Sequence, residues 1–413
     1  MFAQILNIIA LVCYIISGIY CLLILFFGIV GLVGKKIKLK PDGRTTRFAV
    51  MTCARNEEKV IGQLLDSISA QNYPRDCFDI FVVAHNCTDN TAEVSREHGA
   101  TVFVRNAPEE KNKGLALHYG INCLREQFPG KYDAVTIFDS DNIAGRNYLT
   151  EVNKALTSGY QVVQGYRMSK NYHANWISEL FGMFWLSMFH LTLKPQAILG
   201  MPISVNGTGF SFSLDVLGEE GWNTTTLQED QEFSIINAHK GIKSIAIQEA
   251  VYYDEQPTEF KVAIQQRFRW QQGCWQNFTK FFLKNLAMFF KKPLAAFKVG
   301  FDLFVNVALI AGVIAEVIKL VAMICNGVFV PLVFMQLVGD FVACWVGMMF
   351  TGILTVICAK LRFSKNVRAM LLFPGYLCVS FVCAFAAIFA KKPVWVPIEH
   401  KDTTTLDDLE TDK

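Results

Sequence analysis

Residues 134–141 read Ala-Val-Thr-Ile-Phe-Asp-Ser-Asp, an apolar run that ends in two carboxylates separated by one residue. A short apolar run bounded by polar residues is typical of a buried strand. Similar runs occur upstream at 48–51, 78–84 and 101–104, and helical patterns lie between them. This alternation of strands and helices predicts an α/β domain with a mostly parallel sheet covered by helices.

Polar residues follow three of the predicted strands, at 55–57, 86–89 and 139–141. In open α/β sheets, ligands bind beyond the carboxyl ends of the strands. Because parallel strands end at the same edge of their sheet, we expect these polar segments to converge on one site. Their convergence indicates a site more strongly than any one segment does.

Asp139 and Asp141 form the pattern with the clearest chemistry. Two carboxylates at a strand end can hold Mg²⁺, which takes oxygen ligands and commonly bridges one or two carboxylates to the phosphates of a substrate. Such an ion would neutralise the diphosphate that leaves when a nucleotide-sugar gives up its sugar. Alone, two aspartates at this spacing are more often a solvated turn, but their position after a buried strand favours the metal site.

Glu229 and Asp230 open a helical stretch that extends to about Ala238. Transfer of a sugar to a hydroxyl requires a base that accepts the hydroxyl proton, and a carboxylate near the start of a helix can do this. The alternative is a structural role, because acidic residues are favoured in the first turn of a helix.

Residues 266–270 read Gln-Arg-Phe-Arg-Trp, the least common of the patterns. Arg269 can pair with phosphate oxygens through its fork of donors. Trp270 offers a flat apolar face against which a sugar ring can pack. The alternative is an amphipathic helix anchored by Arg and Trp at a membrane surface, and one segment can serve both purposes.

The composition indicates a membrane protein. Of the 413 residues, 52% are hydrophobic and 18% charged, and the mean hydropathy is +0.29, which is too apolar for an ordinary soluble domain. Apolar runs at about 5–33, 299–324, 329–359 and 369–390 are each long enough to cross a bilayer as a helix. The net charge of +3 gives no reason to expect a nucleic-acid partner. The 12 cysteines show no zinc or disulfide spacing, which fits a reducing, cytosolic compartment.

Basic residues flank the apolar runs and predict their orientation. Four lysines at 35–40 directly follow the first run, so the positive-inside rule places the N-terminus outside and the middle domain in the cytosol. Strict alternation of four spans would leave Lys391-Lys392 and the acidic tail outside, against the same rule. Either the last run is re-entrant, with a break at Pro374-Gly375, or one span is miscounted.

Two further stretches, 176–193 and 275–290, repeat apolar residues at helical spacing with Trp and Lys at the edges. Such faces are typical of helices that lie in a membrane surface, although they could also pack on the domain's own core.

Glu316 and Lys319 are one helical turn apart inside an apolar run. Intramembrane charges often line a polar path, which Asp302 and Asp340 could join, but charges near the end of a span can instead reach the interface.

Taken in this order, the patterns make the chain resemble the membrane-integrated family 2 glycosyltransferases, the group of cellulose, hyaluronan and poly-N-acetylglucosamine synthases. The resemblance runs from about Phe48 to Lys284. It implies a GT-A glycosyltransferase domain on the cytosolic face of the plasma membrane, between transmembrane and interfacial helices. It further implies a UDP-sugar donor, Mg²⁺ or Mn²⁺ as cofactor, inversion at the anomeric carbon and a β-linked product.

The domain organisation expected from this resemblance has five parts. They are an N-terminal span with its basic flank at 1–40, a catalytic domain at 41–257, a segment at 258–292 that carries residues 266–270 and an interfacial helix, C-terminal spans at 293–392, and a short polar tail at 393–413.

The resemblance also implies roles for individual residues. Asp139 and Asp141 match the family's metal and diphosphate motif, and Asp230 matches its catalytic base. The expected donor-binding residues are Arg55, Glu57, Asn86, Asp89, Lys113, Gly114, Asp139, Gln266 and Arg269. The expected acceptor side comprises Glu229, Trp270 and, from a loop whose glycines allow close backbone approach, Thr208 and Gly209. One departure lies at 84–89, where His85 or Asn86 stands in place of the carboxylate that the family often has near uracil.

Two kinds of acceptor remain open. The pattern at 266–270 usually accompanies processive synthesis and translocation of a polysaccharide, yet ceramide glucosyltransferases share a similar pattern and transfer one sugar to a lipid. A growing glycan needs a continuous channel, which four spans would form only as a homo-oligomer or with help from the interfacial helices. A lipid acceptor needs a lateral opening toward the membrane lipids.

Overall fold

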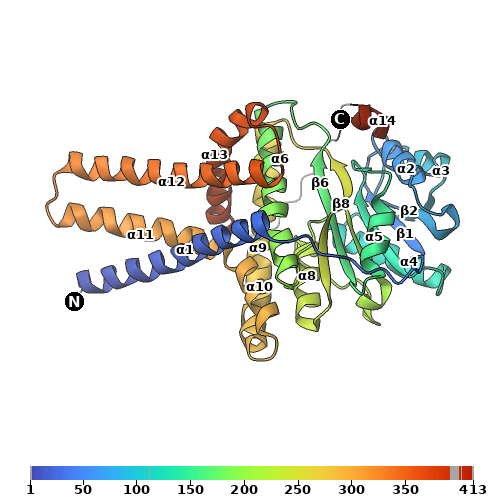
Figure 1. The fold of residues 1–413 in the computed structure, drawn as a ribbon, viewed down its shortest axis with the longest axis horizontal. Coiled ribbons are helices and arrows are strands. Elements are labelled where there is room, and N and C mark those ends of the chain that lie inside the picture. Colours follow the sequence, from blue (N-terminus) through green and yellow to red (C-terminus); the bar gives the residue numbers. More distant parts are fainter. Residues whose placement is uncertain (1, 111, 391–399, 401, 412–413) are drawn as a thin grey trace.

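The computed structural model describes residues 2–110, 112–390, 400 and 402–411. Within these residues the chain forms an α/β domain and a set of long helices that extends from one side of it (Figure 1). A layer of helices lies between the two parts and contacts both.

The α/β domain is built on one mixed sheet. Among the described residues, eight strands pair in the order β3-β2-β1-β4-β7-β6-β8-β5. The first four are parallel, β7 runs antiparallel to both of its neighbours, β6 and β8 are parallel, and β5 is antiparallel to β8. The strands are β1 (Phe48–Ala54), β2 (Phe78–His85), β3 (Thr101–Arg105), β4 (Ala134–Asp139), β5 (Ile143–Ala144), β6 (Val162–Ser169), β7 (Phe210–Ser213) and β8 (Ser244–Asp254).

The register of the central strands decides where polar residues can meet. Phe48 of β1 pairs with Phe78 of β2 and with Ala134 of β4. Cys53 therefore lies beside Asp139, and the segments that follow β1, β2 and β4 leave the sheet at one edge. Nearly every residue of these strands is buried, which is why they read as continuous apolar runs rather than as an alternating pattern.

Helices cover the sheet as the sequence predicts. The apolar face of α2 buries Ile61, Leu64 and Leu65 against the strands. The helix at Glu229 is present and ends at Gly241, whose φ of 83° is the left-handed conformation that closes a helix without strain. The helices of the domain are α2 (Ile61–Ser69), α3 (Thr91–Glu97), α4 (Lys113–Gln127), α5 (Tyr148–Leu156) and α8 (Glu229–Lys240), with short 3-10 helices at Arg75–Cys77 and Leu214–Leu217.

The intermediate layer contains α6 (Trp176–Met188), which continues through a π-helical turn (Phe189–Leu193) into α7 (Lys194–Ile198), together with α9 (Phe260–Phe289) and α10 (Pro293–Leu303). Asn175 starts α6 because its side chain accepts hydrogen bonds from the backbone N–H groups of Ile177 and Ser178. Residues 266–270 lie inside the 30-residue helix α9, and the stretch at 275–290 is the second half of the same helix.

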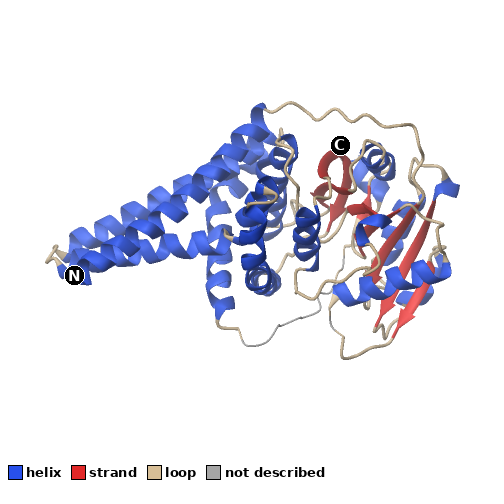
Figure 2. Cartoon of the chain, turned by 90° about the horizontal axis from the view of Figure 1, so that it is seen from below, coloured by secondary structure: helices blue, strands red, loops and turns tan. Residues whose placement is uncertain are grey.

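Four helices in the described part of the chain are long and apolar enough to cross a membrane, by length and composition. They are α1 (Phe2–Val33), α11 (Val305–Cys325), α12 (Val330–Cys358) and α13 (Phe363–Ile388). The first three run side by side away from the α/β domain, whereas α13 crosses their direction and packs on α6 and α9 (Figures 1 and 2).

The bounds of these helices correct two expectations. The apolar run at 299–324 is interrupted at Phe304, where α10 ends and α11 begins, so its first residues belong to the intermediate layer. Helix α13 continues through Pro374, so of the two alternatives left open for the last run, the one with a break at Pro374-Gly375 is wrong. Lys391-Lys392 lies outside the described residues.

The helix α14 (Leu406–Thr411) lies against the α/β domain (Figure 1). Leu406, the first residue of α14, packs with Ile143 of β5 and Tyr253 of β8. Arg146 forms ion pairs with Asp407 at 2.6 Å and Glu410 at 2.9 Å.

Candidate active site

The Asp139-Ser-Asp141 turn lies where β4 leaves the sheet, and a distant loop holds it in place. The backbone N–H of Asp139 donates to Thr208 Oγ1 at 2.8 Å, and the Thr208 hydroxyl donates to Asn142 Oδ1. Thr208 is completely buried. Its side chain therefore supports the turn, and the acceptor contact expected of it stays a prediction.

Lys113 brings a positive charge to this turn from the first residue of α4. Its Nζ forms an ion pair with the Asp139 carboxylate and donates to Gly207 O at 2.7 Å. Burial disfavours the charge on Lys113, but the carboxylates of Asp139 and Glu229 outweigh burial and raise its pKa. At the next residue, a Cβ on Gly114 would lie 2.8 Å from Thr224 Oγ1 and 3.2 Å from Glu229 Cβ, so glycine allows α4 to begin this close to α8.

The second aspartate of the turn is buried and faces the C-terminal segment. Burial raises the pKa of Asp141, and the nearby His400 opposes the rise. His400 Nε2 lies 3.9 Å from Asp141 Oδ2, and its Nδ1 lies 3.1 Å from the carboxylate of Glu57. The two carboxylates raise the pKa of His400 to about 10, against the effect of its burial. The ends of β1 and β4 thus share one imidazole, which sequence analysis did not predict.

The two aspartates fit a metal ion only if the substrate completes its coordination. Among residues 2–110, 112–390, 400 and 402–411, no three His, Cys, Asp or Glu side chains gather into a set that could hold a metal. Asp139 and Asp141 would supply two carboxylates, and phosphates and water would have to supply the remaining oxygens. Mg²⁺ is commonly bound in this way.

Glu229 and Asp230 stand at the start of α8, across from the loop at 206–209. Asp230 Oδ1 accepts a hydrogen bond from the backbone N–H of Gln231 at 2.8 Å. Asp230 Oδ2 would lie 3.4 Å from a Cβ at Gly207, so the glycine leaves space in front of this oxygen. Burial raises the pKa of Asp230, and the positive charges of Lys113 and Arg167 oppose the rise. Burial, followed by the charge of Asp230, raises the pKa of Glu229 to about 7. A raised pKa suits a carboxylate that accepts a proton near neutral pH.

Arg269 of α9 is near the same carboxylates without bonding to them. Its burial lowers its pKa, and the negative charges of Glu229, Asp139 and Asp230 oppose the decrease. The structure gives Arg269 no hydrogen bond or ion pair with any described residue. One turn earlier in α9, Gln266 Oε1 is buried without a hydrogen-bond partner. Trp270 packs with Phe184 and Trp185 of α6 at ring distances of 6.3 and 5.4 Å. Residues 266–270 therefore bring a free guanidinium near the carboxylates, whereas Trp270 joins an aromatic cluster on α6, and its expected contact with an acceptor stays a prediction.

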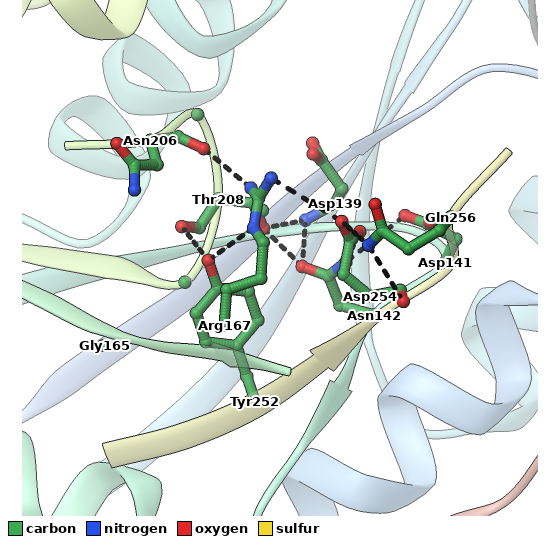
Figure 3. A network of polar contacts seen from close by, with 12 residues as sticks. Asp139, Asp141, Asn142, Gly165, Arg167, Asn206, Thr208, Tyr252, Asp254 and Gln256 are labelled. Atoms are coloured by element: carbon green, nitrogen blue, oxygen red, sulfur yellow. Dashed lines mark hydrogen bonds and ion pairs between the residues drawn. The ribbon is translucent and has the colours of Figure 1, made fainter. Parts of the chain in front are cut away.

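A buried network around Arg167 connects β6, β8, the loop at 206–209 and the Asp139-Ser-Asp141 turn (Figure 3). Arg167, near the end of β6, donates from Nε to Tyr252 Oη at 2.9 Å and from Nη2 to Asn206 O at 2.7 Å. Its Nη1 lies 3.6 Å from Asp254 Oδ2, and Asp254 in turn accepts from Asn142 at 2.9 Å. The network thus fixes the loop at 206–209 relative to the Asp139-Ser-Asp141 turn.

Gly209 allows the loop at 206–209 to pack directly against Tyr252 of β8. Its φ is 57°, and a Cβ at this position would lie 2.1 Å from the ring of Tyr252. The Tyr252 hydroxyl also donates to Thr208 O at 3.0 Å. Gly209 therefore shapes the loop by close packing, and its expected contact with an acceptor stays a prediction.

The predicted residues Asn86 and Asp89, after β2, use much of their bonding capacity to join neighbouring loops at the edge of the sheet. The Asn86 side chain bonds to the backbone of Ala107 in both directions, at 2.7 and 2.8 Å. The Asp89 carboxylate accepts from the backbone N–H groups of Thr91 at 3.1 Å and Glu58 at 3.2 Å. Arg55 and Glu57 follow β1 at the same edge of the sheet. These residues lie where a nucleotide is expected, and their contacts with it stay predictions.

The amino-acid sequence is similar to a known protein family and to several known relatives. Residues 46–273 match the sequence model of a family described as "Glycosyltransferase like family 2". The "Probable glycosyltransferase YdaM" of Bacillus subtilis (strain 168) is 25% identical over 280 residues, which cover 62% of this chain and 61% of that protein. The "Beta-monoglucosyldiacylglycerol synthase" of Synechocystis is 25% identical over 264 residues, which cover 61% of this chain and 53% of that protein. The "4,4'-diaponeurosporenoate glycosyltransferase" of Staphylococcus haemolyticus is 24% identical over 215 residues, 51% of either chain. The matched parts span only about half to three-fifths of these relatives.

One solved structure resembles nearly the whole chain. The mannosyltransferase PcManGT from Pyrobaculum calidifontis, in complex with GDP-Man and Mn²⁺, has a TM-score of 0.63 and 20% sequence identity, and the similarity covers 92% of this chain and 99% of that chain. At this identity the likeness concerns the fold, and it confirms the expected GT-A architecture.

Proposed function

The chain belongs to glycosyltransferase family 2, and we propose that it transfers a single sugar from a nucleotide-sugar to the hydroxyl of a membrane lipid. The observation that carries this proposal is an apolar pocket in the layer between the α/β domain and the long helices. Trp270, the predicted acceptor-side residue, packs at a ring distance of 6.1 Å on Phe181, which lines this pocket.

In the proposed reaction the lipid hydroxyl attacks the anomeric carbon while the bond from that carbon to the diphosphate breaks on the opposite face. Asp230 accepts the proton of the hydroxyl, and the electron pair of the broken bond leaves with the nucleoside diphosphate. The sugar is therefore inverted at the anomeric carbon. The space in front of Asp230 Oδ2 supports this role, because Gly207 presents no side chain there.

The leaving diphosphate needs positive charge, which Lys113 and Arg269 supply in this proposal. Lys113 is fixed by Asp139 and Gly207 O, whereas Arg269 has no bonding partner among the described residues and is free to pair with phosphate. A Mg²⁺ or Mn²⁺ ion bound by Asp139 and Asp141 would neutralise further charge on the diphosphate.

The apolar pocket suits the stem of a lipid acceptor. It holds about 120 Å³, and α6, α9, α12 and α13 contribute its walls, among them Leu180, Phe181, Trp345 and Leu372. Leu372, which lines the pocket, is 39% exposed, so the pocket borders a surface that apolar chains could cover. The names of two relatives, a glucosyldiacylglycerol synthase and a diaponeurosporenoate glycosyltransferase, also support an apolar acceptor.

The packing of the long helices supports a lipid acceptor over an exported polymer. Polymer export would need a continuous polar channel among α1, α11 and α12. The polar residues there bond to one another instead: Tyr14 donates to Glu316 at 2.8 Å, and Lys319 donates to Asp340 at 2.6 Å. Asp302, which could have joined them, lies in α10 and pairs with Lys298 at 2.7 Å.

The proposed orientation has the catalytic domain in the cytosol beneath the plasma membrane. Helices α1, α11 and α12 would cross the bilayer, and α13 would lie in its inner surface. Three crossings leave the C-terminal segment on the side of the α/β domain, where α14 packs. This arrangement agrees with the lysines at 35–40 and avoids the conflict that four alternating spans create.

A donor and acceptor screen tests the proposal. Purified protein would be incubated with lipid extract and radiolabelled UDP- and GDP-sugars, and the product would be sized and extracted into organic solvent. A small, chloroform-soluble product that is absent with the Asp230→Asn variant is expected. A high-molecular-weight glycan would overturn the lipid proposal and identify a polysaccharide synthase.

A further inference from the structure

We propose that a groove at the α12–α13 turn binds the phosphate head group of an anionic membrane phospholipid. The groove lies between this turn and the segment that joins β6 to α6, and its volume is about 350 Å³. It is separate from the apolar pocket beside Trp270, and it does not depend on the identity of the sugar acceptor.

The groove carries positive charge that the protein itself does not neutralise. Lys360, Arg362 and Lys365 all line it and are exposed. None of their side chains has a hydrogen bond or ion pair with a described residue. By contrast, Arg368 of the same segment forms two hydrogen bonds with the Glu179 carboxylate, at 2.8 and 2.9 Å. Arg368 thus ties α13 to α6, and the other three charges remain available for an anion.

The backbone at the start of α13 also favours a negatively charged ligand. Helix α13 begins at Phe363 without a side-chain cap from Arg362 and without an acidic residue in its first turn. The unpaired N–H groups and the dipole of a helix N-terminus favour a negative charge. The three basic side chains and the uncapped helix end meet at one place.

The surroundings of the groove indicate a lipid rather than a free anion. Met168, Leu186 and Leu361 form an apolar part of its lining, beside Tyr172 and Asn366, which bond to each other at 2.7 Å. Just outside the groove, Ile357, Phe363 and Val367 are each 45–48% exposed. A head group in the groove would place its acyl chains against these apolar side chains. Basic pockets at the cytosolic ends of membrane helices bind lipid head groups in this manner.

Lipid binding by the full-length protein in detergent tests the proposal. Native mass spectrometry would follow titrations with palmitoyl-oleoyl phosphatidylglycerol and with the matching phosphatidylcholine. The variant K360Q/R362Q/K365Q is compared with K35Q/K38Q/K40Q, which removes the same number of charges from the other basic flank. Because each basic side chain near the lipid surface contributes about tenfold or less, the groove variant should bind phosphatidylglycerol about a hundredfold more weakly. The flank variant should stay within about threefold of the parent protein, and phosphatidylcholine should bind weakly to all three proteins.

Three outcomes would overturn the proposal. Equal losses in both variants would mean that the lipid responds to general charge. Displacement of phosphatidylglycerol by millimolar inorganic phosphate would identify a site for free anions. Unchanged binding in the single exchange K365E, at an exposed position where folding is not at risk, would exclude the groove even if the triple variant fails to fold.

Discussion

Replacing Arg167 by Met should destabilise the protein more at alkaline than at mildly acidic pH. Arg167 and Asp254 are each 8% exposed, and their side chains approach to 3.6 Å. Burial raises the pKa of Asp254 to about 7, and the charge of Arg167 opposes the rise. Without the guanidinium, the pKa of Asp254 rises further.

The sign of the effect follows from the two states of the chain. An aspartate in the unfolded chain has a pKa of about 4, so the folded protein holds the proton of Asp254 more tightly. The stability gained from this proton is complete below the unfolded pKa and is lost as the pH rises through the folded pKa. At pH 6, Asp254 is mostly protonated in both proteins. At pH 8.5 the parent protein ionises Asp254 beside Arg167, whereas the variant must keep the proton or bury an unpaired charge. The difference grows by up to about 1.4 kcal/mol per pH unit, or about 2 kcal/mol between pH 7 and 8.5.

Thermal unfolding of the metal-free protein in detergent and EDTA measures this difference. The Tm of Arg167→Met should lie further below the parent value at pH 8.5 than at pH 6, by about 4–8 °C, since 1 kcal/mol corresponds to about 2–4 °C in a domain of this size. Tyr252→Phe is the control, because it removes a hydrogen bond from the same network but no charge, and its deficit should not change with pH. An Arg167→Met deficit that is equal at both pH values would refute the pairing of Arg167 with Asp254.

Three further predictions concern the reaction and the loop above it. Asp230→Asn should lower kcat by about 10²–10⁴-fold, as loss of a general base does, while calorimetry still detects nucleotide binding; normal turnover would rule out Asp230 as the base. EDTA should abolish transfer and Mg²⁺ or Mn²⁺ should restore it, whereas full activity in EDTA would refute the metal role of Asp139 and Asp141. Gly209→Ala should destabilise the protein by about 1–3 kcal/mol more than Gly200→Ala. Both glycines have a positive φ, 57° and 68°, but only a Cβ at 209 would collide, at 2.1 Å from Tyr252, whereas one at 200 has nothing within 4 Å. Equal unfolding temperatures would show that the loop moves away without cost.

Much of the sheet edge that carries the candidate active site could be predicted from local patterns. The apolar run at 134–138 specifies a buried strand, and parallel pairing then places Asp139 beside the end of β1. Helical patterns likewise predict that helices begin at about Lys113 and at Glu229, as α4 and α8 do. These predictions succeed because a strand or helix that must bury one face carries its own periodicity, and the parallel sheet aligns the strand ends.

The roles of Thr208, Arg167 and His400 could not be read in this way. Thr208 and Gly209 were expected to face an acceptor, yet their clearest contacts are with the Asp139-Ser-Asp141 turn and Tyr252. Arg167 reaches Tyr252, 85 residues away, and His400 reaches Glu57, 343 residues away. A single Arg in a strand or a single His in a polar tail carries no periodic signal, so only the folded chain reveals its partners.

The sequence by itself determined the alternation of strands and helices, the carboxylate pair at the end of β4 and the presence of apolar helices. Each of these depends on residues that are neighbours along the chain. The tertiary structure alone decided that α13 crosses the direction of the other long helices, and that the Arg167 network and His400 complete the edge of the sheet. Hydropathy measures the length and apolarity of a helix but not its direction, which depends on packing such as the bonds between Arg368 and Glu179.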